Sequence, residues 1–302
     1  MTFRRVWFKS AGLPKNGGAA IEIISDIPTM QARAEALRAE RRTIAFVPTM
    51  GYLHDGHLSL MREGRRRSDV LVVSIFVNPT QFGPGEDLDT YPRDLAGDTR
   101  RCREVGVDIL FTPARDSLYS PEFQTYVSLQ ALPAHLCGLS RPVFFRGVAT
   151  VVTKLFNIVH PHVAVFGMKD YQQLIIIRRM AADLNFNIDV VGAPIVREPD
   201  GLAMSSRNAY LKLEERPAAL TLYRSLQQAQ RMVQDGERDA SRLIAAAHRL
   251  IAAHPAARID YVCICDPHSL EDVATVAQPA LMALAVKVGA ARLIDNALLT
   301  PN

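Results

Sequence analysis

The sequence predicts an α/β protein with a Rossmann-like, doubly wound parallel sheet and a smaller C-terminal α+β domain. Three observations lead to this prediction. The chain of 302 residues is longer than one average domain needs. Runs that are apolar throughout alternate with helical stretches up to about residue 195, as in parallel sheets covered on both faces. Beyond that point two helical stretches precede two strand-like runs, which indicates a separate α+β unit.

Five apolar runs are the predicted strands of the first domain. Prolines stop the first three of them, at Pro48, Pro79 and Pro113. The strands are expected at residues 44–47, 69–77, 108–111, 163–166 and 188–191. The helices between them are expected at residues 58–67, 95–104, 148–159 and 170–184. Ligands of such a sheet bind at the carboxyl ends of its strands.

The second domain is predicted from a change in pattern near residue 195. Its helices are expected at residues 214–234 and 240–253, and its strands at residues 259–265 and 281–288. We therefore expect a Rossmann-like domain over residues 21–195 and a smaller lid domain over residues 196–302. No internal repeat and no low-complexity linker marks the boundary more sharply.

The composition restricts the possible partners. Apolar residues make up 48% of the chain and charged residues 22%, as in ordinary globular proteins. The formal net charge of +4 permits an anionic substrate without selecting one. No aromatic residues interleave with the arginine clusters, so no nucleic-acid partner is expected. No segment reaches the roughly 18 apolar residues of a membrane span, so no membrane partner is expected either.

The cysteines and the N-terminal segment bear on location. The four cysteines lack metal-ligand spacing, and Cys263 and Cys265 are expected to form a packed, reduced pair. Reduced thiols fit the cytoplasm. The first twenty residues are basic and contain no acid, which resembles a transit peptide, but a proline and two glycines break any long helix. A disordered tail over residues 1–20, or an upstream start codon, is the preferred interpretation.

A turn with two histidines follows the first predicted strand. Its sequence is Pro48-Thr49-Met50-Gly51-Tyr52-Leu53-His54-Asp55-Gly56-His57. Its glycines let the backbone approach a ligand, and the start of the next helix offers unpaired N–H groups to a phosphate. His54 and His57 can both donate hydrogen bonds to charge on an α-phosphate and on leaving pyrophosphate. Two surface or N-capping histidines are the alternative, and a metal site would lack a third ligand nearby.

Two further segments suit phosphate binding. Met204-Ser205-Ser206-Arg207-Asn208 resembles the Lys-Met-Ser-Lys-Ser loop that partners the histidine motif in nucleotidyl-transferring α/β enzymes. Such a loop can close over a triphosphate and exclude water, whereas alone it would be a turn with a surface arginine. In the run 166–173, Gly167 permits a tight turn and Lys169 offers a point charge. A helix-start lysine beside an N-capping Asp170 is the alternative there.

Together these motifs resemble the pantothenate synthetase family, over about residues 20–297. The resemblance is also carried by Ser74-Ile75-Phe76-Val77-Asn78-Pro79-Thr80-Gln81-Phe82, Tyr91-Pro92-Arg93, Phe145-Arg146-Gly147-Val148, Ser205-Ser206-Arg207-Asn208-x-Tyr210-Leu211 and Ala291-Arg292-Leu293-Ile294-Asp295-Asn296. It implies a two-step ligation. Pantoate attacks the α-phosphate of ATP to give pantoyl adenylate and pyrophosphate, and β-alanine then displaces AMP.

The resemblance also implies roles for particular residues. His54, His57, Lys169 and Arg207 would stabilise the reacting anions, with His57 as the proton donor, and Gln81 and Gln173 would hold pantoate. Mg²⁺ would be bound chiefly by the triphosphate, with Asp98 as a candidate protein ligand, and the enzyme would be a homodimer. The implied ATP contacts are Met50, Gly51, Tyr52, Leu53, His54, Asp55, Gly56, His57, Gly167, Met168, Lys169, Asp170, Val196, Met204, Ser205, Ser206 and Arg207.

Two positions depart from the family pattern. Met168 stands where an acidic residue is expected, and Thr80 where methionine is common. Two rival functions are also considered. A cofactor adenylyltransferase of the same fold would leave AMP on its product, and the contexts of Gln81 and Gln173 argue against it. A catalytically inactive nucleotide- or RNA-binding module would have no chemical need for both histidines, Lys169 and Arg207.

Overall fold

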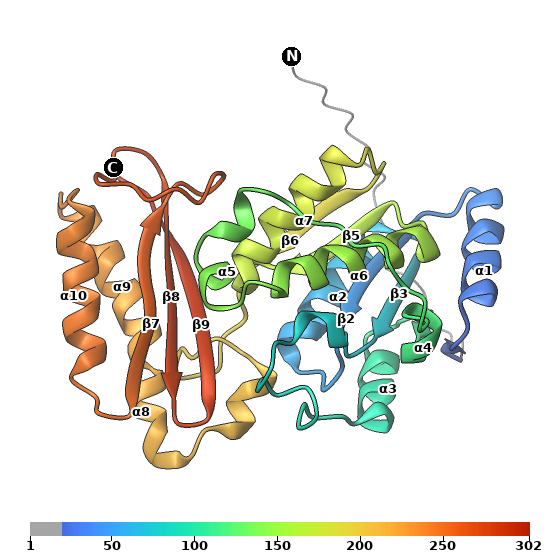
Figure 1. The fold of residues 1–302 in the computed structure, drawn as a ribbon, viewed down its shortest axis with the longest axis horizontal. Coiled ribbons are helices and arrows are strands. Elements are labelled where there is room, and N and C mark those ends of the chain that lie inside the picture. The colour runs from blue at the N-terminus through green and yellow to red at the C-terminus, as the bar shows by residue number, and fades with distance from the viewer. Residues whose placement is uncertain (1–19) are drawn as a thin grey trace.

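The computed structural model describes residues 20–302, so the tail predicted over residues 1–20 lies, except for residue 20, outside the described residues. Within them the chain forms a six-stranded sheet and a three-stranded sheet that lie side by side (Figure 1). The first sheet is parallel throughout and the second is antiparallel. The predicted fold class is confirmed.

The six-stranded sheet has the order β1-β4-β3-β2-β5-β6. Its strands are β1 (Glu22–Ile24), β2 (Ile44–Thr49), β3 (Val70–Ile75), β4 (Ile109–Phe111), β5 (Val163–Gly167) and β6 (Asp189–Ala193). The chain runs outward from β2 through β3 to β4 and then crosses to β5. Strand order therefore reverses between β2 and β5, and a crevice that can receive a ligand opens at such a point.

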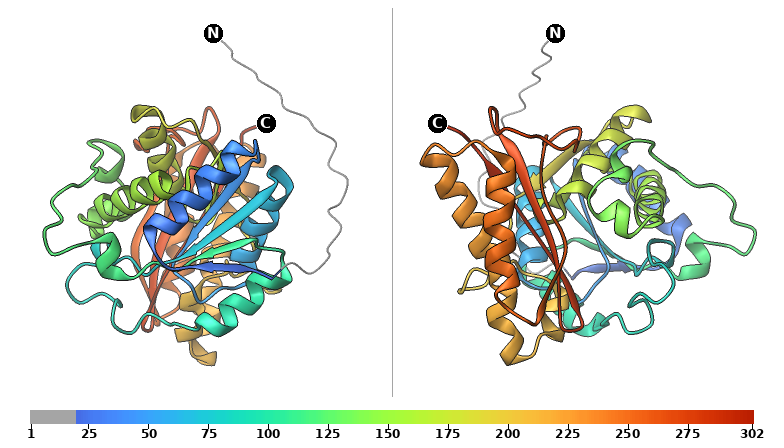
Figure 2. Two further views of the ribbon diagram at one scale, coloured as in Figure 1. Left: turned by 90° about the vertical axis from the view of Figure 1, so that its right-hand side faces the viewer. Right: turned by 60° about the vertical axis from the view of Figure 1, so that its left-hand side comes forward.

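Helices cover both faces of this sheet, as Figure 2 shows. Successive residues of β3 alternate between the two faces: Val70 and Val72 join one hydrophobic cluster, and Leu71 and Val73 join the other. The first face packs against α1 (Ile27–Ala39), α6 (Phe144–Val159) and α7 (Tyr171–Asp183). The second packs against α2 (Asp55–Arg67) and α3 (Leu95–Glu104). Burial on both faces explains why these strands are apolar throughout.

Short helices occupy the connections. They are η1 (Pro79–Gln81), α4 (Arg115–Leu118), η2 (Leu132–Ala134), α5 (Cys137–Ser140), η3 (Met168–Asp170), η4 (Ser206–Tyr210) and η5 (Leu213–Glu215). The sequence prediction missed β1 and α1. β1 has only three residues and the first is a glutamate, so no apolar run of ordinary strand length marks it. The prediction that Pro48 ends the strand before it was wrong, because β2 continues to Thr49. β2 pairs with β5 only at Ala45 and Phe46, so the N–H that Pro48 lacks is not needed there.

The C-terminal part has its own hydrophobic core around the antiparallel sheet. α9 and α10 lie on the side of this sheet that faces away from the six-stranded one (Figure 1). The long helix predicted at residues 214–234 is divided at Leu220, and the third strand was not predicted. The elements are α8 (Arg216–Ala219), α9 (Thr221–Gln234), α10 (Ala240–Ala252), β7 (Ala257–Cys265), β8 (Ala280–Val288) and β9 (Ala291–Leu299).

A further hydrophobic cluster joins the two parts. It brings Phe145, Ile175 and Ile176 of the first part against Cys265 and Leu281 of the second. All four cysteines are free; Cys265 is buried and Cys263 is partly exposed. Across residues 20–302, none of the helices is both long enough and apolar enough to cross a bilayer.

Candidate active site

A cavity of about 280 Å³ opens at the carboxyl ends of four neighbouring strands. Thr49 and Gly167 are the last residues of β2 and β5, and Phe76 and Pro194 directly follow β3 and β6. The cavity lies at the carboxyl ends of the strands, where the sequence predicted a ligand, and near the point where strand order reverses. On its other side the cavity is walled by β7, β8 and β9, through Tyr261, Leu281, Ala283, Arg292, Ile294, Asp295 and Asn296.

The turn that carries the two histidines contains left-handed backbone conformations, and a buried carboxylate stabilises it by hydrogen bonds. Gly51 has φ +84° and Tyr52 has φ 52°, so two successive residues lie in the left-handed region. Asp98, at the start of α3, accepts hydrogen bonds from the backbone N–H groups of Tyr52 (2.8 Å) and Leu53 (2.7 Å). A Cβ on residue 51 would lie 2.9 Å from the Asp98 carboxylate. The turn therefore needs both the glycine and the aspartate.

The position of Asp98 does not favour the metal-binding role that the resemblance implied. It is 3% exposed, it does not line the cavity, and each of its oxygens accepts a backbone N–H. Its carboxylate shapes the histidine turn, and we do not retain it as a candidate Mg²⁺ ligand. No group of three or more potential ligands from His, Cys, Asp and Glu occurs among residues 20–302.

The hydrogen bonds of the two histidines define their tautomers. The backbone N–H of His54 donates to Nδ1 of His57 (3.3 Å), and that of Gly56 donates to Nδ1 of His54 (3.2 Å). Because each Nδ1 accepts, the proton of each neutral ring is on Nε2. The ring centroids lie 4.1 Å apart. Both rings line the cavity and each keeps one N–H to donate.

Both imidazoles are held in the neutral form. Burial lowers the pKa of His54 to about 4, and the nearby Lys169 charge adds to the effect. Burial also lowers the pKa of His57 well below its ordinary value, helped by His54 and then Lys169. At neutral pH both rings are therefore uncharged, and each offers an N–H instead of a fixed positive charge.

We expect the lowered pKa of His54 to make stability depend on pH. Between pH 6.5 and about 4 the unfolded chain binds a proton that the folded chain resists, so this contribution is complete above pH 6.5 and is lost as the pH falls. Relative to His54→Asn, the wild type should lose about 2 kcal/mol more between pH 7 and pH 5. Asparagine keeps an N-cap acceptor without titrating. Urea unfolding of both proteins at each pH measures the difference, and parallel pH dependences would contradict the prediction.

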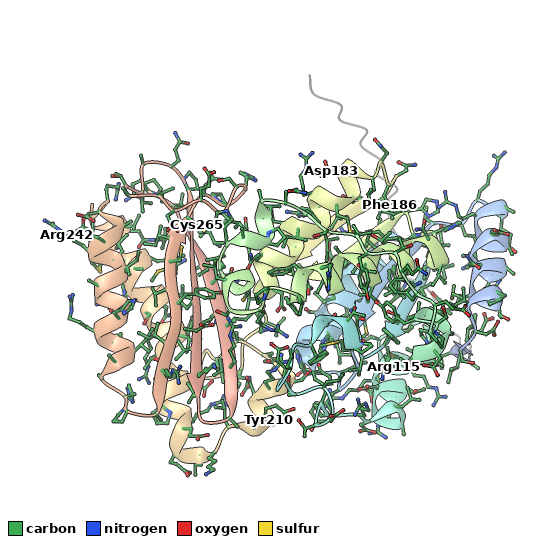
Figure 3. The ribbon with its side chains drawn as sticks, viewed as in Figure 1. Arg115, Asp183, Phe186, Tyr210, Arg242 and Cys265 are labelled. Atoms are coloured by element: carbon green, nitrogen blue, oxygen red, sulfur yellow. The ribbon has the colours of Figure 1, made fainter. Side chains whose placement is uncertain are left out.

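The loop predicted to close over the triphosphate touches the histidine turn directly. Ser206 Oγ donates to the carbonyl of Tyr52 at 3.2 Å, across 154 positions of sequence. Arg207 makes two hydrogen bonds with the carboxylate of Asp87, from Nε (3.0 Å) and Nη2 (2.9 Å). Tyr210 ends this short helix near the lower edge of the molecule in Figure 3, and its ring packs against the hydrophobic cluster of the C-terminal part. The two motifs thus face one cavity.

The turn around Lys169 faces the same space. Among the described residues, the only hydrogen-bond partner of the Lys169 ammonium is Asp170 Oδ2, at 3.5 Å. Gly167 ends β5 and lines the cavity, whereas the Met168 side chain packs against the hydrophobic cluster beside α6 and α7. The methionine at the family's acidic position therefore lies outside the cavity.

The two predicted glutamines also line the cavity. Gln81 accepts from Asn78 Nδ2 at 3.0 Å, and its own amide lies 3.0 Å from Met50 Sδ. Among residues 20–302, none hydrogen-bonds the side chain of Gln173, so it is available to a ligand. Gln172 instead holds residues 132–137 through three backbone hydrogen bonds. Thr80, the second departure, does not line the cavity, and its hydroxyl hydrogen-bonds to Asn78 and Tyr119.

Most of the predicted contact residues meet in the cavity, and some do not. Those that do not line it are Gly51, Tyr52, Leu53, Asp55, Met168 and Asp98. The residues that line it are Met50, His54, Gly56, His57, Gln81, Gly167, Lys169, Asp170, Gln173, Val196, Met204, Ser205, Ser206 and Arg207. Sequence reasoning missed Asn78, Arg141 and the residues of the C-terminal sheet. Asp295 and Asn296 stood in a quoted string, but nothing in it indicated their position.

A doubly wound sheet whose central strands end in a His-x-Gly-His turn, facing a cationic loop, defines the class of nucleotide-activating α/β enzymes. Comparison with known proteins narrows this class. The family described as pantoate–beta-alanine ligase matches residues 22–298. The chain belongs to this family and is therefore an ATP-dependent acid–amine ligase.

Individual relatives agree over nearly the whole chain. A pantothenate synthetase of Desulfatibacillum aliphaticivorans is 62% identical over 93% of this chain and all of its own length. The structure of a Thermus thermophilus pantothenate synthetase has a TM-score of 0.89 at 43% identity, covering 93% of this chain and all of that one. A Francisella tularensis pantoate–beta-alanine ligase, solved with beta-gamma ATP and beta-alanine, has a TM-score of 0.77 at 32% identity, covering 92% and 98%.

Proposed function

We propose that the cavity binds ATP and pantoate together, forms pantoyl adenylate, and then passes the pantoyl group to β-alanine. One observation carries the assignment to this site. His54, His57, Lys169 and Arg207, which come from three distant segments, line one cavity with the two glutamines. The products are pantothenate, AMP and pyrophosphate.

The first step joins two anions, so the site must offset their repulsion and align them. A carboxylate oxygen of pantoate attacks the α-phosphorus, and the bond from that phosphorus to the bridging oxygen of pyrophosphate breaks. Lys169 and Arg207 supply positive charge, and the neutral histidines donate Nε2–H to oxygens on which charge develops. Gln81 and Gln173 can both donate to and accept from the hydroxyls and carboxylate of pantoate. No protein nucleophile is required.

The second step exchanges one acyl bond for another. The neutral amine of β-alanine attacks the acyl carbon of pantoyl adenylate, the bond to the AMP oxygen breaks, and the nitrogen releases its proton to solvent. The same cationic groups that received pyrophosphate now face the leaving phosphate of AMP. We place both steps in one cavity because the two glutamines line the same cavity as the histidines, Lys169 and Arg207.

Mg²⁺ fits this site as a partner of the triphosphate. Such ions are commonly held by substrate phosphates with one or two carboxylates, and need no protein cage. Of the two carboxylates that line the cavity, Asp295 is paired with Arg197, whereas Asp170 is half-exposed and lies beside Lys169. We propose that Asp170 would hold the ion, which would supply further positive charge at the phosphates.

Other expectations remain proposals. We propose a cytoplasmic enzyme that works as a homodimer, with a domain boundary near residue 195. The separate hydrophobic clusters on either side of that position support the boundary. Sedimentation of the purified chain tests the dimer.

The function is tested with purified protein, ATP, pantoate and β-alanine. We expect AMP and pyrophosphate in equal amounts, with AMP release dependent on β-alanine. Without β-alanine, pantoate should still support ATP–pyrophosphate exchange. A cofactor adenylyltransferase would keep AMP on its product. AMP release that is independent of β-alanine would contradict the proposed ligase reaction.

A further inference from the structure

We propose that Asp295 and Asn296, adjacent in β9, are positioning residues that align the Lys169 turn with the Arg207 loop. The proposal rests on the function proposed above. It assigns to the C-terminal sheet a part in pantoate adenylation beyond closing the cavity. Neither side chain need touch ATP for this role, because each acts through a segment that carries a phosphate-facing cation.

Asn296 binds the backbone of the Lys169 turn. Its Nδ2 donates to the carbonyls of Met168 (3.0 Å) and Lys169 (2.9 Å), so the amide bridges two successive peptide groups of η3. The residue is 7% exposed, and a buried carbonyl that lost this donor would have no water to replace it. Within residues 20–302 the Lys169 ammonium hydrogen-bonds to Asp170 alone, at 3.5 Å, so the backbone of the turn determines where the side chain starts.

Asp295 binds the segment that leads to Arg207. Its two oxygens accept from Arg197 Nη1 (2.6 Å) and Nη2 (2.9 Å), a bidentate pair whose carboxylate is buried. Arg197 also donates to the carbonyl of Gly201 at 3.1 Å and pairs with Ala203 across a tight hairpin. The hairpin closes with the N–H of Met204 on the carbonyl of Val196 at 3.0 Å. Ser205, Ser206 and Arg207 follow immediately.

The two contacts are linked through one peptide. The N–H of Asn296 donates to Asp295 Oδ1 at 2.9 Å, so the same carboxylate that binds Arg197 also fixes the start of Asn296. Both residues lie within β9, which pairs with β8 along its whole length. A paired strand is more rigid than a loop, and the Lys169 turn and the Arg207 loop are both attached to β9. The strand therefore fixes the position of one relative to the other. Their relative placement then decides whether both cations meet one triphosphate.

The experiment removes the amide and asks whether its effect passes through Lys169. We expect Asn296→Ala to lower the kcat of pantoate-dependent ATP–pyrophosphate exchange on the order of 10- to 100-fold, as small misplacements do. Asn296→Asp keeps the shape but removes the donor, and should lose as much. Asn302→Ala is the matched control, because its amide makes a single hydrogen bond, to the carbonyl of Gln234, at the exposed C-terminus. It should exchange like wild type.

Double-mutant cycles distinguish positioning from general support. With Lys169→Ala already present, Asn296→Ala should cause little further loss, whereas a merely structural role would multiply the two losses. In the same way, Arg197→Lys keeps the charge but loses the bidentate geometry. It should lower the kcat of exchange about 10-fold when Arg207 is present, and have little effect in an Arg207→Ala background. Melting temperatures of all variants are measured alongside.

The outcomes separate this proposal from the proposed function. Wild-type protein without pantoate-dependent exchange would remove the function itself. Wild-type exchange with Asn296 variants that match wild type, or losses that multiply in the Lys169→Ala background, would overturn the positioning role alone. If Asn296→Ala fails to fold, the isosteric Asn296→Asp decides the question by the same cycle.

Discussion

Replacing His57 with alanine is expected to lower pantoate-dependent ATP–pyrophosphate exchange by about 10²–10³-fold, the usual cost of losing one preorganised donor. The ring is buried and neutral, and its Nδ1 is occupied by the backbone N–H of His54. The remaining Nε2–H therefore needs no reorganisation when charge develops on the phosphates. We expect the loss mainly in kcat, because the developing charge is present in the transition state and not in bound ATP.

Two variants frame this result. His248 lies exposed on α10, away from the cavity, so His248→Ala should exchange like wild type. His57→Gln supplies an N–H donor from an amide side chain and should recover part of the exchange rate lost in His57→Ala. An alanine variant that keeps the wild-type kcat would remove His57 from the mechanism.

Replacing Lys169 with alanine should have an effect of similar size, by a different cause. The change removes a full charge that lines the cavity and that, in the described part of the chain, hydrogen-bonds to Asp170 alone, at 3.5 Å. Both the bound triphosphate and the transition state lose this charge, so we expect ATP affinity and kcat to fall together, with kcat/KM about 10²–10³-fold lower. Exchange assays over a range of ATP concentrations measure both quantities.

The position of the charge can be tested separately from its presence. Lys169→Arg keeps the charge in a larger, planar group and should restore ATP affinity more than kcat. Lys287→Ala, on an exposed residue of β8 outside the cavity, controls for the change in net charge. Unchanged kcat/KM in Lys169→Ala would show that another group neutralises the triphosphate.

The fold could be predicted because its signals are local. Val72 and Val73 are both apolar and point to opposite faces of the sheet, and such a pattern requires helices over both faces. The strand β1 gave no such signal, because three residues at the edge of the sheet need little burial. β9 alternates in burial only over part of its length, and its Asp295 and Asn296 are buried polar residues that an apolar pattern does not detect.

The candidate site could be predicted only where its residues belong to a recognisable sequence motif. The histidines, Lys169 and the Arg207 loop all stand in recognisable sequence motifs, and all line the cavity. Residues that support them gave no signal. Asp98 resembles a possible metal ligand until the structure shows two backbone amides on its carboxylate. Such partners are separated by tens of residues and meet only through the sheet topology.

The hydrophobic cluster shared by the two sheets also bears on how the chain emerges from the ribosome. The six-stranded sheet has all its strands once β6 has been made, but Ile175 and Ile176 on α7 then still lack their cover. That cover is Cys265 of β7 with Leu281 and Ala283 of β8, which are synthesised much later. During this interval the nascent protein presents an apolar face that can associate with other chains. The contact between the two sheets can therefore form only well after the six-stranded sheet has all its strands.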